Sequence, residues 1–348
     1  MAMRVDTYTS VAPIAGEWDE LAKRTGASPF LRPGWIDAWS RAFGGGSLEV
    51  LALRRNGELA GALAVQRRAR GVYAPANWHT PEWGPVAADD DAARELFDAV
   101  FARHPPYALL RFLGPGTAQA LEAARAAGYS ANARPLQQSP YIELGGGWDS
   151  LPQPRAKNVA KAKQKLGDVE LEWSERLDGL LDDVLRLEGS GWKVELGTAI
   201  VSQPRLRSFY EEVMRWGDRE GILRIAFLRI GDRRIAVEFG FQDERRFYNI
   251  KGGYDPEFKK HSPGLLIAHD LIKKCADQGL ETFEYLGAAE PMKMEWTDRT
   301  RDVVSLEAFS PRPLGRLARA SYVHGRPLAK RGAAALKRAG RRGARDAT

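Results

Sequence analysis

Apolar positions recur along this chain with two periods, and the order of these periods predicts the fold. Strict alternation of apolar and polar residues is typical of half-buried strands, and a spacing of about 3.6 residues is typical of helices. In the second half we expect strands at 169–173, 222–230, 234–241, 246–251, 282–286 and 303–309, and helices at 177–192, 205–216, 264–278 and 291–296.

The first half is a weaker copy of this order of elements, with almost no residue identity. We expect strands at 4–8, 48–54, 58–67, 108–113 and 141–144, and helices at 18–23, 33–42, 91–103 and 117–127. Asn56-Gly57 between two of these strands is a strong hairpin signal. A repeated order indicates a tandem architecture. We therefore predict an α/β (α+β) fold with two similar domains, each a mixed, mostly antiparallel sheet flanked by helices.

The segment between the halves is rich in glycine and then strongly basic. Gly145-Gly146-Gly147 precedes an expected helix at 151–166, which has five Lys and Arg residues and no acid. A solvated helix face explains this charge, and so does a cationic rim for an anionic ligand. The expected divisions are an N-terminal domain at 1–147, a connector at 148–167, a catalytic domain at 168–311 and a tail at 312–348.

The loop before the expected helix 264–278 is suited to an anion. Ser262 is a good N-cap, and Pro263 occupies the first helical position, where its missing N–H costs nothing. Gly264 leaves the neighbouring amides uncovered. Amides and the helix dipole together attract a phosphate or pyrophosphate.

Composition narrows the class of protein. Of the 348 residues 44% are hydrophobic, which supports a substantial core, and the one cysteine, Cys275, is expected to be a buried core residue. The chain has neither the apolar run of a signal peptide nor a stretch long enough for a membrane span. We expect a cytoplasmic protein.

The positive charge is concentrated at the C-terminal end. Residues 312–348 have eleven Lys and Arg residues and one acid, Asp346, so residues 1–311 are slightly acidic although the whole chain is +7. An acidic body makes nucleic acid an unlikely partner. Because leucines and alanines are interspersed among its cations, the tail suits an anionic membrane surface, which would place the protein on the inner face of the membrane. A disordered solubilising tail is the alternative.

Several short sequence motifs of the second half resemble those of a known family. They are Glu188-x-x-x-Trp192-Lys193, Phe209-Tyr210, residues 235–240, Tyr248-x-x-Lys251-x-Gly253-Tyr254-Asp255, Ser262-Pro263-Gly264, and Gly287 followed by Lys293-x-x-Trp296. In element order and in these motifs the chain resembles the tandem GNAT acyltransferases of the CelD-like branch. Fem-type transferases, which use aminoacyl-tRNA, share the architecture.

The resemblance implies a donor and a site for it. The donor would be acetyl-CoA or another acyl-CoA, and the acceptor an amine. The pyrophosphate would lie on the backbone between the fourth strand and the next helix, where His261, Ser262, Pro263, Gly264 and Leu265 stand, with Lys293 near the thioester. The loop differs from the usual Gln/Arg-x-x-Gly-x-Gly/Ala pattern of single-domain members.

Four residues are candidates for the chemistry. Glu238 lies in an apolar strand, with Ala236 and Gly240 on the same face, so it is a candidate base; an ion pair with Lys251 is the alternative. Tyr254 is a candidate donor to the leaving thiolate, and His261 a candidate acid or base. Packing or surface roles are open for each.

Four further residues are expected on the acceptor side: Glu188, Trp192, Lys193 and Trp296. The five histidines are scattered without ligand spacing, so we expect no metal. We predict an acyl-CoA-dependent N-acyltransferase whose acceptor is a membrane-presented sphingoid-type amine or an envelope amino sugar. Aminoacyl transfer from charged tRNA and a non-catalytic role in polysaccharide assembly are the alternatives.

Overall fold

The computed structural model describes residues 3–68, 70–190 and 200–323. The first half contains β1 (Met3–Tyr8), α1 (Ala15–Thr25), α2 (Pro33–Phe43), β2 (Ser47–Arg55), β3 (Glu58–Arg68), β4 (Gly71–Tyr73), β5 (Val86–Ala87), α3 (Asp90–Ala102), β6 (Tyr107–Leu113), α4 (Thr117–Ala126) and β7 (Ser130–Glu143). The second contains α5 (Ala156–Leu166), β8 (Val169–Ser174), α6 (Leu181–Glu188), α8 (Pro204–Arg219), β9 (Leu223–Ile230), β10 (Arg233–Gln242), β11 (Arg246–Tyr254), α9 (Pro263–Asp277), β12 (Thr282–Glu284), α10 (Pro291–Met294) and β13 (Thr300–Phe309). Apart from the short β5 and the connector helix α5, the two halves have the same order of elements, which the sequence predicts except for β4.

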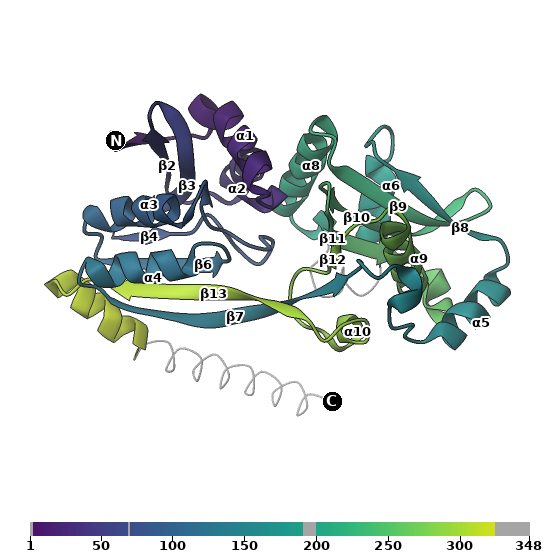
Figure 1. Ribbon diagram of the computed structural model, residues 1–348. Helices are drawn as coiled ribbons and strands as arrows, with labels where there is room; N and C mark the ends of the chain where they lie inside the picture. The colour runs from purple at the N-terminus through teal and green to yellow at the C-terminus, as the bar shows by residue number, and fades with distance from the viewer. Residues whose placement is uncertain (1–2, 69, 191–199, 324–348) are drawn as a thin grey trace, which may run out of the picture.

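The strands of both halves form one sheet. Within the described ranges its order is β1-β2-β3-β4-β6-β13-β7-β12-β11-β10-β9-β8, and β5 pairs with β3 beside this path. Figure 1 shows the halves side by side, with the long strands β7 and β13 running along one side of the molecule. The fold is mixed α/β with a mostly antiparallel sheet flanked by helices, which confirms the predicted class.

β13 and β7 join the halves by exchange. β13 comes from the end of the second half but lies between β6 and β7. β7 pairs with β13 from Ser130 to Pro140, and then with β12 from Tyr141 to Glu143. Neither half therefore completes its sheet without a strand from the other. The sequence predicts only the last residues of β7, because Pro135 and Pro140 interrupt the alternation of its first part.

α2 and α8 form a second join through close aromatic packing. The rings of Trp35 and Phe209 meet edge to face at 5.1 Å. Gly34 is needed here, because a methyl group at its Cα would come within 2.4 Å of the indole of Trp216. Arg32 adds an ion pair to Glu220 across the halves, at 2.6 Å. One buried apolar cluster consequently extends through both halves.

Several expected boundaries need correction. The helix expected at 177–192 spans Leu181–Glu188 in the described residues, and the connector helix begins at Ala156. The core also does not end with the last strand. Residues 313–323 are helical, and Tyr322 donates a hydrogen bond to Glu307 of β13. Cys275 is buried, as expected.

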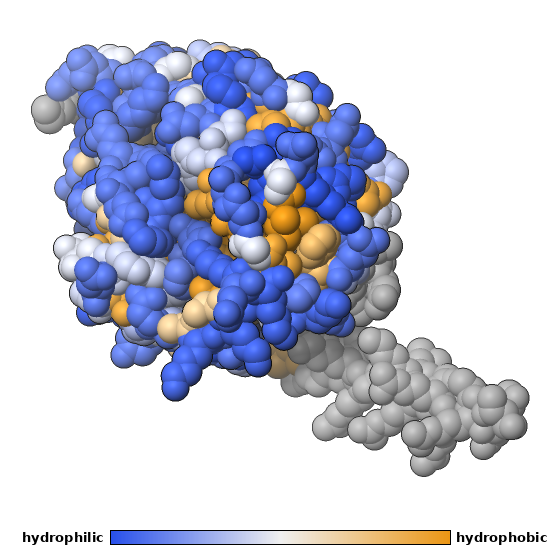
Figure 2. All heavy atoms as spheres, turned by 90° about the vertical axis from the view of Figure 1, so that its right-hand side faces the viewer, coloured by the Kyte–Doolittle hydropathy of each residue, from blue (hydrophilic) through white to orange (hydrophobic). Residues whose placement is uncertain are grey.

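The surface of the second half is mostly hydrophilic. Figure 2 views this end of the molecule and shows a limited group of hydrophobic residues inside a hydrophilic surround. Among the helices in the described ranges, none combines the length and apolar character that a membrane span needs. Leu314, Leu317 and Val323, all near the C-terminal end of the described chain, are at least half exposed, at 55%, 65% and 50%.

Candidate active site

A slot opens in the second half where two parallel strands diverge. β11 and β12 pair at only three positions, from Arg246–Thr282 to Tyr248–Glu284. β11 then continues beside β10 to Tyr254, while the chain after β12 turns away through Leu286, whose φ is 58°. The slot has a volume of about 500 Å³. It is lined by residues 78–81, Gln137, Ser190, Tyr210, Glu238, residues 249–254, Gly264, Leu265, Ala268, residues 285–288, Glu290, Met292, Lys293 and Trp296.

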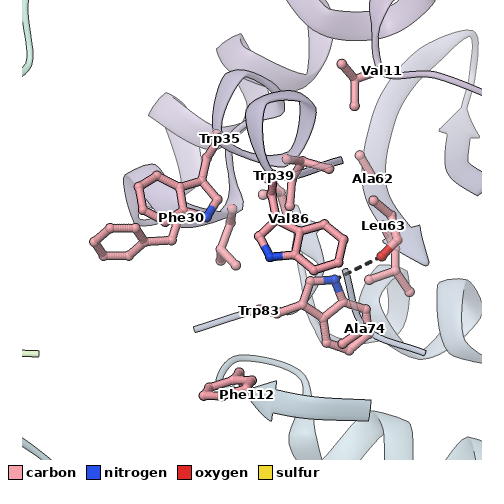
Figure 3. Packing of buried hydrophobic residues seen from close by; sticks show 14 of the residues in the cluster. Val11, Phe30, Trp35, Trp39, Ala62, Leu63, Ala74, Trp83, Val86 and Phe112 are labelled. Carbon is pink, nitrogen blue, oxygen red and sulfur yellow. Dashed lines mark hydrogen bonds between the residues drawn. The ribbon is translucent and has the colours of Figure 1, made fainter. Parts of the chain in front are cut away.

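The corresponding place in the first half is closed by Trp83. β4 and β6 are also parallel and also paired at three positions. Beyond that pairing, the backbone of Trp83 bonds to Phe112 and Gly114, and its indole N–H donates to the Ala64 carbonyl at 2.9 Å. Figure 3 shows this fully buried ring between Trp39 and Phe112. Of the two equivalent places, the second half therefore has the open one.

Glycine at position 252 makes room for the Glu238 carboxylate. The β10–β11 register sets Glu238 opposite Gly252, and a methyl group on Gly252 would lie 2.1–2.3 Å from the carboxylate atoms. Gly253 is equally constrained, since its methyl group would lie 2.3 Å from the Leu187 carbonyl oxygen. The two glycines thus continue β11, where the sequence predicts that they end it. They allow a carboxylate and the end of α6 to approach the strand.

Glu238 and Lys251 project from opposite faces of the sheet. The same register sets Lys251 opposite Phe239, one residue away from the Glu238–Gly252 pair. Lys251 Nζ contacts Oε1 of the fully buried Glu188 at 3.2 Å, whose other oxygen accepts the Ile200 N–H at 2.7 Å. The contact with Glu188 thus differs from the Glu238–Lys251 ion pair considered from the sequence.

Tyr210 and His79 complete the Lys251 side of the slot. Lys251 Nζ lies 5.3 Å from the centre of the Tyr210 ring, and the Tyr210 hydroxyl shares a hydrogen bond of 3.3 Å with His79 Nδ1. Burial raises the pKa of Tyr210 well above its usual value. Burial, and then the charge of Lys251, lower the pKa of His79 to about 4. Both side chains are therefore neutral at pH 7.

Glu238 shares the other side of the slot with Tyr285 and Lys293. Burial raises the pKa of Tyr285, and the charge of Glu238 raises it further. Burial lowers the pKa of Lys293 although Glu290 and Glu238 act in the opposite direction. Lys293 Nζ donates to the Leu286 carbonyl at 2.9 Å and so holds the loop that forms one wall.

The start of α9 borders the slot through Gly264. Ser262 is the N-cap, as predicted, but its backbone is left-handed (φ 53°) and its side chain makes no capping hydrogen bond. Its carbonyl instead accepts the Leu265 and Leu266 N–H groups at 3.0 and 3.2 Å. Within the described chain, no acceptor is found for the Gly264 N–H. Lys259 and Lys260, both exposed, lie in the preceding 3₁₀ helix (Pro256–His261) and add positive charge.

The slot gathers some of the expected site residues and leaves others outside its lining. Glu188 lies behind Lys251, and Glu238, Lys251, Tyr254, Gly264, Leu265, Lys293 and Trp296 line the slot. His261, Ser262 and Pro263 stand beside it at the start of α9 and do not line it. Trp192 and Lys193 lie outside the described residues. Trp296 is almost wholly buried against Trp148 and His269, so much of its surface serves packing.

The sequence does not indicate the contribution of the first half. Trp78, His79 and Gln137 line the slot of the second half. Nothing in their spacing links them to β11, because only the packing of the halves brings them there. Among the described residues, no group of three or more His, Cys, Asp or Glu side chains is placed to hold a metal ion.

Comparison with known proteins gives a domain family for part of the chain. Residues 155–294, which contain α9 and most of the slot, match the acetyltransferase (GNAT) domain family. No curated protein sequence matches the chain.

Three solved structures have a similar fold. FemX superposes with a TM-score of 0.63 at 11% identity, covering 91% of this chain and 99% of that one. A conserved protein of unknown function from Bacteroides thetaiotaomicron gives 0.59 at 9% identity, with coverages of 88% and 100%. L-PGS from Bacillus licheniformis gives 0.53 at 10% identity, with coverages of 86% and 93%. At these identities the likeness concerns the fold alone.

Proposed function

We propose that this protein transfers an acyl group from a CoA thioester to a primary amine, because residues 155–294 match the acetyltransferase (GNAT) domain family. The observation that carries the proposal is the slot between β11 and β12, which extends from the start of α9 to Glu238. The slot would hold the donor phosphate at the start of α9 and the reacting groups near Glu238.

The donor would enter along the edge of β11. Beyond Tyr248 this strand is no longer paired with β12, so its outer edge faces the slot. An extended chain with amide groups, such as the pantetheine arm, can hydrogen-bond to such an edge. The pyrophosphate would bind the Gly264 N–H, assisted by the α9 dipole and the nearby Lys259 and Lys260.

The chemistry needs a proton acceptor, a stabilised oxyanion and a proton donor. Glu238 would take a proton from the attacking amine as the new C–N bond forms. Collapse of the tetrahedral intermediate breaks the C–S bond, and the departing thiolate takes a proton from a neighbouring hydroxyl. Tyr254 and Tyr285 both line the slot and are the candidates for that donor.

The acceptor would reach the slot from the side of the first half. Trp78, His79 and Gln137 form that side. The basic tail favours an amine presented at a membrane, such as a sphingoid-type lipid base, over a soluble envelope amino sugar. About 1 kcal/mol of attraction to anionic lipid per basic residue is typical of such segments.

Calorimetry tests the donor directly. Acetyl-CoA and long-chain acyl-CoAs are titrated into the full-length protein and into Gly264→Val. A methyl group on Gly264 would lie 3.7 Å from the Tyr254 ring, an ordinary contact, so the variant has room to fold. We expect it to bind CoA at least about tenfold more weakly, because the branched side chain covers the amide. Gly145→Val, at a position with nothing within 4 Å, is the matched control.

The main alternative is aminoacyl transfer from charged tRNA. The similarity of the fold to that of FemX is the observation that favours this alternative. A charged tRNA is therefore titrated beside the acyl-CoAs. Binding of the tRNA, together with no binding of any acyl-CoA, would replace the CoA proposal by the tRNA one. No binding of either would favour a non-catalytic role in assembly.

A further inference from the structure

A second hollow lies on the open face of the joined strands. α4, which belongs to the first half, covers one face of β13 and β7 (Figure 1). Ser130, Asn132 and Arg134 alternate along β7 and therefore share one face. They line a trough of about 900 Å³ between this face and the helical residues 313–323. We call this hollow the β7–β13 trough.

The walls of the trough are partly apolar. Leu136 and Phe309 line it from the sheet, and Val323 from the helical segment. Val323 is 50% exposed, although it is aliphatic. Trp78, 65% exposed, lines both the trough and the slot, so the two hollows meet at this ring. A concave surface that combines apolar walls with a few polar groups, next to a reaction site, is typical of a ligand groove.

The remaining charges of the trough are positive. Its one acid, Glu307, already accepts hydrogen bonds from Arg134, at 2.7 Å, and from Tyr322. Arg111 lies over the rings of Trp78 and Phe112, at 5.3 and 5.6 Å. In the part of the chain that the structure describes, neither Arg111 nor Arg319 has a carboxylate within ion-pair distance. Two guanidinium groups thus remain to attract an anion.

The apolar walls and the two arginines together indicate which kind of molecule the trough can bind. The chain's own residues 324–348 carry eight Lys and Arg residues and one acid, so they are repelled by the same two arginines. Nucleic acid binds to a row of cations along its backbone, and aliphatic side chains such as Leu136 and Val323 do not contribute to that binding. A molecule with a hydrocarbon chain and an anionic head satisfies both the apolar walls and the arginines.

We propose that the β7–β13 trough binds an anionic amphiphile, with its phosphate at Arg111 and Arg319 and its hydrocarbon chain along Leu136, Phe309 and Val323. Because the trough meets the slot at Trp78, this molecule is the acceptor or carries it; that clause alone rests on the proposed acyl transfer. The acceptor would then bear a phosphate in addition to its amine.

The test uses dodecyl phosphate as the probe, below its micellar concentration, titrated into the full-length protein by calorimetry. Inorganic phosphate and dodecyl maltoside separate the contributions of head and chain. We expect dodecyl phosphate to bind more tightly than either. We also expect the double variant Arg111→Gln/Arg319→Gln to bind it at least about tenfold more weakly, because each lost charge-assisted contact is strong.

The controls keep the inference separate from the donor site. Arg125→Gln changes an exposed arginine of α4, on the covered side of the sheet, and should leave binding unchanged. Val323→Glu introduces a negative charge without touching the stack of Arg111 on its rings, and serves if the double variant does not fold. The proposal is overturned if wild type, Arg111→Gln/Arg319→Gln and Val323→Glu bind dodecyl phosphate with equal affinity. It is also overturned if inorganic phosphate binds as tightly as dodecyl phosphate, or if an RNA oligonucleotide binds more tightly. If the wild-type protein binds dodecyl phosphate but no acyl-CoA, the proposed acyl transfer is overturned and the proposal for the trough still stands.

Discussion

The carboxylate of Glu238 occupies the space that a side chain at Gly252 would need. A methyl group on Gly252 would lie 2.1 Å from the carboxyl carbon of Glu238, closer than any stable contact. The two residues face each other on neighbouring strands, so the glycine fixes where the carboxylate stands. This carboxylate borders the slot near Tyr285 and Lys293.

Replacement of Glu238 by glutamine tests its role as a base. We expect turnover with a primary amine to fall by roughly 10²-fold or more, because the amide keeps the shape and loses the basicity. Affinity for the CoA donor should be unchanged. Steady-state kinetics with calorimetry of donor binding measures both quantities, and near-normal turnover would show that Glu238 is not the base.

Replacement of Gly252 by alanine should displace the same carboxylate without altering its chemistry. We expect a loss of turnover comparable to that of Glu238→Gln, since the added methyl group and the carboxylate cannot share one place. The double variant Gly252→Ala/Glu238→Gln should be little worse than either single one, because both act on one group. Gly145→Ala, at an open position, is the control. Fully additive losses would show that Gly252 acts independently of Glu238.

Much of the fold follows from the sequence because its signals are local. Asn56 and Gly57 have the positive φ values, 54° and 89°, that their hairpin requires. Pro263 begins α9 at the expected position. The alternation of residues 234–241 correctly predicts a strand, β10. Such signals depend only on a residue and its near neighbours in the chain.

The parts that the sequence does not predict depend on contacts between distant segments. Gly252 and Gly253 suggest a strand end, yet they serve the approach of Glu238 and of α6. His79 lies 131 positions from Tyr210 and shows no local pattern, and only the packing of the halves joins them. The exchange of β7 and β13 leaves no mark in a single sequence for the same reason.

His79 should make stability depend on pH in a defined window. Its pKa is lowered to about 4 in the folded protein by burial and by Lys251, whereas the unfolded chain takes up a proton near the ordinary value of about 6.5. Between these values the unfolded state binds more protons, so stability rises with pH. The contribution is fully present above about 6.5 and is lost as pH falls toward 4, by up to about 1.4 kcal/mol per unit.

The variant His79→Gln isolates the contribution of His79 to the pH dependence of stability. Glutamine retains a hydrogen-bonding partner for Tyr210 and does not titrate. Urea unfolding of both proteins at several pH values between 4.5 and 7.5 should show a shallower pH dependence for the variant. His104→Asn, at an exposed position with a positive φ that asparagine tolerates, should follow the wild type. Parallel curves for wild type and His79→Gln would contradict the burial argument.

A truncation that tests the predicted membrane contact of the tail must leave the helical residues 313–323 in place. Ending the chain after Ser310 would remove residues that pack, since Gly315 lies against the Ser310 and Pro106 carbonyls and Tyr322 bonds to Glu307. A cut after Val323 removes eight Lys and Arg residues and leaves those contacts intact. We expect this truncated protein to keep its unfolding midpoint and its CoA affinity. It should lose salt-sensitive binding to vesicles of anionic lipid, because about 1 kcal/mol per engaged basic residue is removed.

Co-sedimentation with anionic and with neutral vesicles, at low and at high ionic strength, measures that binding. A full-length variant with the last eight Lys and Arg residues changed to glutamine is the matched control, because it keeps the length of the tail and removes its charge. Loss of sedimentation in both proteins would assign the membrane contact to charge. If the truncated and full-length proteins sediment equally, the tail does not bind the membrane, and a lipid acceptor would depend on the β7–β13 trough alone.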